Sequence, residues 1–273
     1  MVRAGCVAFL KEVLPRLGLS WRGFRRVDAQ VCKRIRRRFL ALGLADLAAY
    51  RSYFEKHPAE WDVLQSLCHI TISRFWRDRA VFDRLAAEIV PQLAGAAASR
   101  GDTMLRAWSA GCASGEEPYS LKLLWEFLIA PKYPGIAISI VATDADTASL
   151  LRARTACYRV SSLRELSDGW IRAAFDRQGP LYCLRESFRT SIAFREEDIR
   201  VQAPEGPFDL ILCRNLAFTY FERAGQEAAL NRMVAELRLG GALIVGRGER
   251  LPPHDSMLED WHPGLGIYRK QRE

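Results

Sequence analysis

Hydrophobic positions in the first third of the chain repeat with the spacing of an α-helix. Apolar residues recur at helical intervals in AFLKEVLPRL, VCKRIRRRFLALGL and DLAAYRSYF, which predicts amphipathic helices from residue 5 to about residue 90. Gly18, Gly43 and Pro58 separate these segments. We expect Leu85–Leu93 to form a connecting helix and the small, polar stretch Ala94–Asp102 to form a loop.

From Thr103 onward the pattern changes to short apolar runs that alternate with helical segments. Such alternation predicts a mostly parallel sheet with helices on both faces. We therefore expect a basic all-helical domain with its linker at residues 1–90 and an α/β domain at 91–273, interrupted by a short β-hairpin at about 181–194. The predicted strands are Met104–Ser109, Ile136–Thr143, Thr190–Phe194, Phe208–Cys213 and Ala242–Gly246, and the predicted helices are Pro118–Ile129, Thr147–Arg154 and Arg223–Leu237.

Charge is distributed unevenly between these two parts. Residues 1–84 carry 17 Lys and Arg against 8 Asp and Glu, whereas the remaining residues carry 23 against 24. The net charge of +8 therefore arises in the helical part, and an acidic partner for that part is one interpretation. A solvated helix face is the alternative interpretation, because Ile35 and Phe39 would point inward and the arginines of RIRRRF outward.

Several classes of protein do not fit the composition. No uncharged apolar run reaches the roughly 18 residues of a membrane span, and the N-terminus has no clear signal-peptide core or cleavage site. The 7 cysteines are scattered without a CxxC pair, which favours reduced thiols in a cytoplasmic protein over a disulfide or zinc framework. The 4 histidines lack the spacing of metal ligands, so we expect no structural metal.

The most informative segment is RAWSAGCASGEEPYS at residues 106–120, where an apolar run, a turn of small residues and a helix start follow one another. Glycines let the backbone approach a ligand closely, and the helix start offers unpaired N–H groups. In dinucleotide-binding folds such a turn holds a phosphate, which Glu116 and Glu117 would repel here. Carboxylates at this position favour a cationic ligand, and S-adenosylmethionine fits better than a dinucleotide.

Two other predicted strands end in polar residues. Asp144 follows IAISIVAT, at the place where an acid binds ribose hydroxyls in nucleotide-binding α/β folds; capping of the next helix by Asp144 or Asp146 is the alternative. Arg214 and Asn215 follow FDLILC, at the strand end that faces ligands in open α/β sheets, although an ordinary loop start is the commoner case.

The segment HITISRFWRD, at residues 69–78, is unusual because alternating apolar and polar residues lead into two aromatics and Arg77. A connector that buries Phe75 and Trp76 and pairs Arg77 with Asp78 at the surface is the simplest interpretation. The other interpretation depends on a resemblance that all these segments share.

Together the segments resemble the CheR-type chemotaxis methyltransferases, which transfer a methyl group from S-adenosylmethionine to glutamate side chains of chemoreceptors. The resemblance spans nearly the whole chain and is carried by RRRFLALGL, AAYRSYF, TISRFWRD, RAWSAGCASGEEPYSLKLL, ATDADTASLLRARTACYRVSSLREL and FDLILCRN followed by YF. It implies a Rossmann-like α/β methyltransferase domain with a small N-terminal helical domain. It also implies S-adenosyl-L-methionine as cofactor and protein-glutamate O-methyltransferase activity.

The resemblance further implies roles for single residues. Glu116 would hold the amino group of the cofactor, Asp144 its ribose, and the pair Asp198–Ile199 its adenine. Arg77 would orient the substrate carboxylate, and Tyr220 would donate a hydrogen bond nearby, so these two are the implied catalytic residues. The implied cofactor-binding residues are Thr71, Ser73, Arg77, Glu116, Asp144, Asp198, Ile199, Arg214 and Asn215.

The chain departs from the family pattern in several places. CRNLAFTYF is one residue longer than the usual CRNVxIYF, so the alignment of Tyr220 with the tyrosine of the family pattern is not fixed. Asp198 replaces the usual Asn, RFW replaces the usual RFF-type sequence, and VGRGERLP replaces a more typical GHSE. The hairpin that helps to dock the receptor in the family is short here. Cofactor use is therefore better supported than the chemoreceptor substrate.

Methyl transfer to a carboxylate needs no strong general base, because a glutamate with a pKa near ~4.3 is already ionised at neutral pH. We expect a protein-glutamate methyltransferase whose partner is a chemoreceptor cytoplasmic helix or another acidic protein. A methyltransferase for a small molecule or a non-receptor protein is the alternative. A non-catalytic cofactor sensor or nucleic-acid binder is the third class, against which the complete site argues; we expect no nucleic-acid partner and no membrane insertion.

Overall fold

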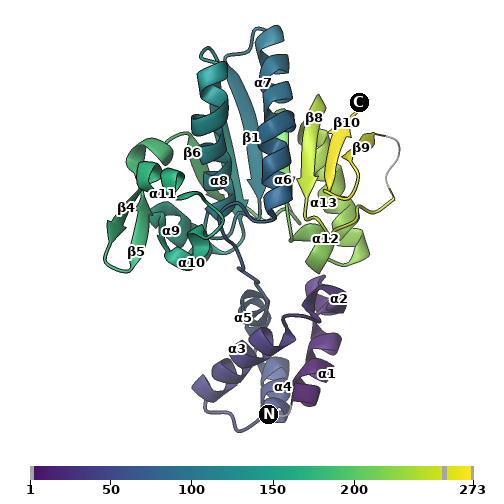
Figure 1. Ribbon diagram of the computed structural model, residues 1–273. Coiled ribbons are helices and arrows are strands. Elements are labelled where there is room, and N and C mark those ends of the chain that lie inside the picture. The colour runs from purple at the N-terminus through teal and green to yellow at the C-terminus, as the bar shows by residue number, and fades with distance from the viewer. Residues whose placement is uncertain (1–2, 254–256, 272–273) are drawn as a thin grey trace. The chain divides into compact units, whose positions relative to one another are not determined.

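The computed structural model describes residues 3–253 and 257–271. By its contacts the chain forms two compact units, which we call the helical unit (Met1–Ile70 and Thr219–Gln226) and the α/β unit (Thr71–Phe218 and Glu227–Glu273) (Figure 1). This boundary differs from the expected one at residue 90. The reason is that Phe75, Phe82 and Leu85 are buried in the core of the α/β unit.

The helical unit is built around an aromatic core. Phe9, Phe39 and Phe54 surround Tyr50 with ring centroids 4.8 to 6.2 Å from that of Tyr50. The amphipathic periodicity of the sequence explains this core, because each helix turns one apolar face inward. The helices are α1 (Arg3–Val13), η1 (Pro15–Leu17), α2 (Trp21–Phe24), α3 (Asp28–Ala41), α4 (Leu47–Lys56) and α5 (Glu60–Leu67).

Helix α3 carries the basic run of the sequence. Ile35 and Phe39 are buried, as predicted, and Arg36 and Arg37 are exposed. The neighbouring arginines have structural partners instead. Arg34 donates to the carbonyl oxygens of Leu67 and His69, and Arg38 pairs with Glu60. Only part of the basic run is therefore available to a partner.

Glu60 is a buried acid at the start of α5. Its two carboxylate oxygens accept hydrogen bonds from Arg38 at 2.8 and 2.7 Å, and the Tyr50 hydroxyl donates to one of them at 2.7 Å. The hydrogen bonds from Arg38 lower the pKa of Glu60, and burial raises the pKa of Tyr50. The ion pair thus ties α3 and α4 to α5.

Replacing Glu60 by alanine is expected to lower the free energy of unfolding by about 2 kcal/mol, because the buried Tyr50 hydroxyl and the partly exposed Arg38 lose a charged partner. Since folding lowers the pKa of Glu60, its contribution is present above the unfolded-state pKa and is lost as the pH falls through the folded-state pKa. Circular dichroism during urea unfolding of the full chain at several pH values measures both effects. Glu55→Ala, an exposed change on α4, is the control; equal stability of the two variants would contradict the prediction.

The α/β unit is centred on a seven-stranded sheet of order β6-β2-β1-β7-β8-β10-β9. The predicted parallel sheet is confirmed for its first five strands, and the last two run antiparallel. The chain fills one side of β1 with β2 and β6 and then returns to the other side with β7 and β8. Ligands of open α/β sheets bind at such a reversal, outside the carboxyl ends of the strands. The strands are β1 (Met104–Ala110), β2 (Ala137–Asp144), β6 (Ile192–Glu196), β7 (Phe208–Cys213), β8 (Leu237–Val245), β9 (Leu258–His262) and β10 (Ile267–Lys270).

Helices cover this sheet and bury its apolar runs. Every residue of β7 is buried, as expected for a central parallel strand. The helices α7 and α8 flank β1 in Figure 1. Helix α7 continues to Ser99, so the loop expected at Ala94–Asp102 is wrong for residues 94–99, because Ala94 and Ala97 face the core. The helices are α6 (Arg79–Arg84), η2 (Leu85–Ile89), α7 (Val90–Ser99), α8 (Glu116–Leu124), η3 (Trp125–Ile129), η4 (Ala130–Lys132), α9 (Thr147–Thr155), α12 (Ala217–Tyr220) and α13 (Arg223–Glu236).

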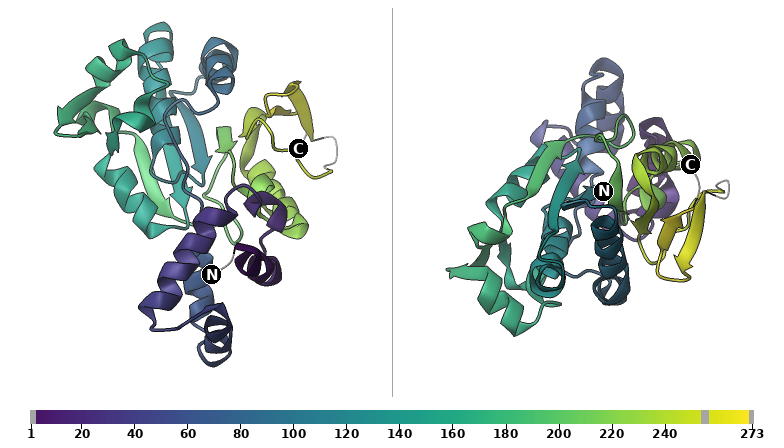
Figure 2. Two further views of the ribbon diagram at one scale, coloured as in Figure 1. Left: turned by 60° about the horizontal axis from the view of Figure 1, so that its bottom comes forward. Right: turned by 90° about the horizontal axis from the view of Figure 1, so that it is seen from above.

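A second, small sheet of order β3-β5-β4 corrects the predicted hairpin at 181–194. Its hairpin joins β4 (Phe175–Gln178) to β5 (Leu181–Leu184), and β3 (Cys157–Arg159) pairs with β5. The second half of the predicted hairpin instead forms β6 in the main sheet. Figure 2 shows the small sheet and the yellow C-terminal strands at opposite edges of the α/β unit. The short helices α10 (Val160–Leu163), α11 (Asp168–Ala174) and η5 (Glu186–Phe188) accompany the small sheet.

Four cysteines form disulfides, so the expectation of reduced thiols is wrong for them. Cys6 in α1 pairs with Cys32 in α3, and Cys157 in β3 pairs with Cys183 in β5. Each pair is 26 residues apart in sequence, and only the packing of the two elements brings the thiols together. Cys68, Cys112 and Cys213 are buried and unpaired. Among the described residues, no helix combines the length and the apolar character that crossing a membrane requires.

Candidate functional site

The small-residue turn lies where β1 ends, beside the reversal of strand order. Gly111 and Gly115 have φ angles of +72° and +88°, which glycine adopts without strain. A Cβ on Gly111 would lie 2.3 Å from the Cδ2 atom of Leu216, so a larger residue there would have to displace that side chain as well as adopt the positive φ. Backbone N–H groups of Gly111 and Cys112 donate to the Thr143 carbonyl at 2.8 and 2.9 Å. The turn is therefore fixed to the end of β2 and leads directly into α8.

Glu116, the first residue of α8, is a buried acid with an unpaired oxygen. Glu116 is 5% exposed, and its side-chain oxygen Oε2 has no hydrogen-bond partner among the described residues. Burial raises the pKa of this carboxyl group, and an interaction with the Ser73 side chain opposes that shift. A buried carboxylate with one oxygen that lacks a hydrogen-bond partner is stabilised by a cationic ligand. The residue therefore fits the ammonium group of S-adenosylmethionine.

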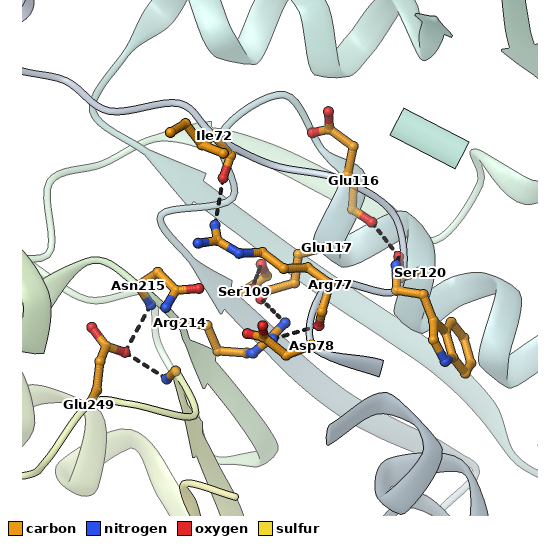
Figure 3. A network of polar contacts seen from close by, with 12 residues as sticks. Ile72, Arg77, Asp78, Ser109, Glu116, Glu117, Ser120, Arg214, Asn215 and Glu249 are labelled. Atoms are coloured by element: carbon orange, nitrogen blue, oxygen red, sulfur yellow. Dashed lines mark hydrogen bonds and ion pairs between the residues drawn. The ribbon is translucent and has the colours of Figure 1, made fainter. Parts of the chain in front are cut away.

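Glu117, the next residue, has the opposite environment. One carboxylate oxygen accepts from the Ser109 hydroxyl at 2.8 Å, and the other accepts from Arg214 at 3.1 Å. Figure 3 shows this bridge from the end of β1 to the end of β7. The sequence treats the two glutamates as one acidic pair. The structure separates them into a ligand-facing acid and a structural acid.

Asp144 and Asp146 also have distinct roles, which resolves the capping alternative. Asp146 caps α9, because its carboxylate accepts from the N–H of Ala148 at 3.2 Å and from the Ser149 hydroxyl at 2.6 Å. Asp144 accepts from the N–H of Ala113 at 2.8 Å and from that of Asp146 at 2.8 Å. Asp144 thus holds the glycine turn to the end of β2.

Replacing Asp144 by alanine is expected to lower the affinity for S-adenosylhomocysteine by about one to two decades, because a charged hydrogen bond contributes about 1.5–3 kcal/mol. Asp146→Ala should instead lower the free energy of unfolding by about 0.5–2 kcal/mol and leave that affinity unchanged. Calorimetric titration and urea unfolding of both variants test the contrast. The assignment is wrong if the two variants exchange these effects.

The connector from Thr71 to Asp78 is held by the ends of β7 and α8. Phe75 and Trp76 are buried, as predicted, and the backbone N–H of Trp76 donates to the Ser120 hydroxyl at 2.9 Å. The Arg77 guanidinium donates to the Ile72 carbonyl at 2.5 Å, and burial lowers its pKa. The hydrogen bond of the Arg77 side chain is therefore made to another residue of the connector, and Asp78 pairs with Arg214 instead.

Arg214 holds three elements of the site together, and the cofactor contact that the resemblance implies for it stays a prediction. Its side chain is 1% exposed and donates to the Arg77 carbonyl at 2.7 Å, to Asp78 at 2.8 Å and to Glu117 at 3.1 Å. These contacts join the connector, α8 and β7 (Figure 3). Arg214 thereby fixes the backbone from which Arg77 extends.

The remaining predicted residues lie in different environments. Asn215 has a φ angle of +58° and a buried carboxamide oxygen without a partner among the described residues. Asp198 accepts three hydrogen bonds from the Arg200 guanidinium at 2.6 to 3.1 Å, which compensates the charge introduced in place of the usual Asn. Ile199 beside it is buried. Thr71 and Ser73 are half-buried in the connector.

Tyr220 belongs to the helical unit. Its ring centroid lies 5.1 Å from that of Phe24, and its carbonyl accepts from the N–H of Ser20 at 2.7 Å. Its role beside a substrate stays a prediction. The sequence interpretation missed two residues at this edge, Glu117 as a bridge and Glu249 as an acceptor of backbone N–H groups. The retained Glu of the family's GHSE segment was the available signal for Glu249.

These features define the class of protein. A Rossmann-like sheet carries a glycine turn, a buried ligand-facing acid and a strand-end acid at its reversal, and it is suited to a cationic nucleoside cofactor. The family described as "CheR methyltransferase, SAM binding domain" matches residues 71–262. The chain therefore belongs to the CheR methyltransferase family, whose members use S-adenosylmethionine.

Two chemotaxis methyltransferases agree with this membership. The chain is 33% identical over 243 residues to a chemotaxis protein methyltransferase of Listeria monocytogenes, covering 89% of this chain and 88% of that protein. It is 31% identical over 271 residues to that of Salmonella typhimurium, covering 90% of each. The solved N-methyltransferase NodS of Bradyrhizobium japonicum overlaps 71% of this chain and 99% of that chain at 14% identity, with a TM-score of 0.37.

Proposed function

We propose that this chain transfers the methyl group of S-adenosylmethionine to glutamate side chains of a protein, forming methyl esters, and that chemoreceptors are the protein substrate. The observation that carries the proposal is the buried Glu116 with its unpaired oxygen at the glycine turn. Membership in the CheR family and the chemotaxis methyltransferases of Listeria and Salmonella support the choice of reaction and substrate.

The described residues are suited to bind the cofactor. Glu116 would pair with its ammonium group, Asp144 would accept from its ribose, and Asp198 with Ile199 would meet its adenine. The carboxamide oxygen of Asn215 would accept one further N–H or O–H donor. When bound, S-adenosylmethionine supplies an electrophilic methyl group.

The chain itself has only to align and desolvate the acceptor. A glutamate side chain is already ionised at neutral pH, so the site needs no general base. Arg77 would orient this carboxylate through its planar guanidinium, which can donate two parallel hydrogen bonds. Its Nη1 donor is engaged by Ile72, and this contact limits the directions in which the remaining donors can point. Alignment of this kind is the main source of rate for such a displacement.

The exposed basic side chains of α3 support an acidic protein partner. Lys33, Arg36 and Arg37 are exposed, whereas Arg34 and Arg38 are engaged within the helical unit. Attraction between exposed charges is screened by salt, with a Debye length of about 8 Å at physiological ionic strength. The proposed contact should therefore weaken as the salt concentration rises.

Incubating the full chain with methyl-labelled S-adenosylmethionine and a cell extract tests the reaction. We expect label in membrane protein, released as methanol by mild base, because methyl esters hydrolyse under conditions that leave N-methyl groups intact. Glu116→Gln is the matched control and should transfer little label. Label that enters a soluble protein or a small molecule as a base-labile ester would support the alternative carboxylate substrates. Base-stable label would contradict ester formation.

A further inference from the structure

Glu249 is a half-buried acid in the turn after β8, outside the set of residues to which the sequence assigned a role. A single carboxylate oxygen, Oε2, accepts from the backbone N–H of Asn215 at 2.8 Å and from that of Gly246 at 2.6 Å. The Glu249 N–H in turn donates to the Gly246 carbonyl at 2.8 Å. One side chain thereby joins the carboxyl ends of the neighbouring strands β7 and β8, as Figure 3 shows.

Gly246 makes this junction possible. A Cβ on Gly246 would lie 2.4 Å from the Asn215 side-chain nitrogen and 2.7 Å from Glu249 Oε2. Both distances are too short for real atoms, so any larger residue would displace one or both side chains. Gly248, two residues further on, has nothing within 4 Å of its Cβ position.

Asn215 is the residue that this junction fixes. It has left-handed backbone geometry, which asparagine tolerates better than most residues but which still needs support from its surroundings. Its carboxamide oxygen is buried and has no partner among the described residues, so it is available to a ligand donor. A small rotation of this backbone would move the oxygen, because it is only two bonds beyond the Cβ.

We propose that Glu249 and Gly246 are positioning residues for cofactor binding: they hold Asn215 so that its carboxamide oxygen accepts a hydrogen bond from S-adenosylmethionine or S-adenosylhomocysteine. The inference rests on the proposed use of this site for that cofactor. Glu249 itself acts through Asn215, because its Oε2 already serves two N–H groups of the backbone.

Calorimetric titration with S-adenosylhomocysteine compares two alanine substitutions in the same turn. Gly246→Ala should bind about tenfold or more weakly, the size of effect expected when a binding group is displaced by a fraction of an ångström to an ångström. Gly248→Ala should bind as the wild-type chain does. If the wild-type chain binds and both variants bind equally well, the inference is overturned. If the wild-type chain does not bind at all, the proposed function fails and the inference fails with it.

A double-mutant cycle distinguishes positioning from general destabilisation. Asn215→Gly removes the carboxamide and keeps the left-handed backbone, and Glu249→Ala removes the junction. If Glu249 acts through Asn215, adding Glu249→Ala to Asn215→Gly should cost no further affinity. Glu249→Gln, which keeps an acceptor oxygen, should bind more tightly than Glu249→Ala. Additive losses, or a loss for Glu249→Ala that Arg247→Ala shares, would overturn the inference.

Discussion

Replacing Arg77 by alanine is expected to lower methyl transfer about a hundredfold or more at saturating cofactor, while the affinity for S-adenosylhomocysteine falls far less. The guanidinium extends from a connector whose backbone is fixed by Arg214, and its Nη1 donates to the Ile72 carbonyl. Among the described residues its other N–H groups have no hydrogen-bond acceptor, so they can meet an acceptor carboxylate.

The measurement is the methyl-transfer rate with an identified substrate, beside a calorimetric titration of the same variant. Arg77→Lys should also fail, because an ammonium cannot reproduce the planar fork of the guanidinium. Arg79→Ala is the matched control, since Arg79 is an exposed arginine that binds Glu165 at the surface. Near-normal turnover of Arg77→Lys, or a loss confined to cofactor affinity, would show that Arg77 is a cofactor or structural contact.

Replacing Glu116 by alanine is expected to weaken the binding of S-adenosylhomocysteine by roughly two to four decades. Removing one partner of a buried ion pair costs about 3–5 kcal/mol, because the other charge stays buried without compensation. The Glu116 carboxylate is almost fully buried, and its Oε2 has no partner among the described residues. In the alanine variant, the ammonium group of the ligand would therefore lose the carboxylate that we expect to compensate its charge. Glu196→Gln, an exposed acid at the end of β6, is the control for charge alone.

The same residue should make binding depend on pH. Burial raises the pKa of Glu116 above its ordinary value, and a bound cation favours the ionised form. Affinity should therefore rise with pH through this raised pKa, and binding at mildly acidic pH should release protons. Calorimetry in buffers of different ionisation enthalpy measures the release. Glu116→Gln should abolish it, and a pH dependence that survives in this variant would assign the effect to another group.

Local patterns in the sequence were sufficient to predict several helices and strands and the turn that forms the candidate cofactor site. The helical period of α3 predicted the inward side of Ile35 and Phe39, because burial of an apolar stripe is a property of one helix. The segment FDLILC, apolar except for Asp209, predicted a strand, and every residue of that strand is buried in the parallel sheet. The glycines of the turn and the acid at the start of α8 predicted a ligand site, since left-handed backbone and helix termini are decided by a few neighbouring residues.

The division of roles among neighbouring acids was decided by tertiary structure alone. Glu116 and Glu117 are adjacent in sequence, yet only Glu117 meets Ser109 and Arg214. Asp146, two residues after Asp144, caps the helix, whereas Asp144 holds the turn. Sequence spacing did not assign these roles, because Arg214 and Ala113, the partners of Glu117 and Asp144, lie 97 and 31 positions away, whereas Asp146 is engaged by its own helix.

Contacts between residues far apart in the sequence account for the features that the sequence did not predict correctly. Arg214 reaches Asp78 across 136 positions of sequence, and Glu249 reaches the backbone of Asn215 across 34. The disulfides, the small sheet and the unit boundary at residue 70 depend in the same way on which elements meet. The sequence by itself determined the elements, the cofactor turn and the family resemblance. Only the tertiary structure decided which polar groups are engaged in holding the site together and which remain for a ligand, because that depends on burial and on partners that no local pattern encodes.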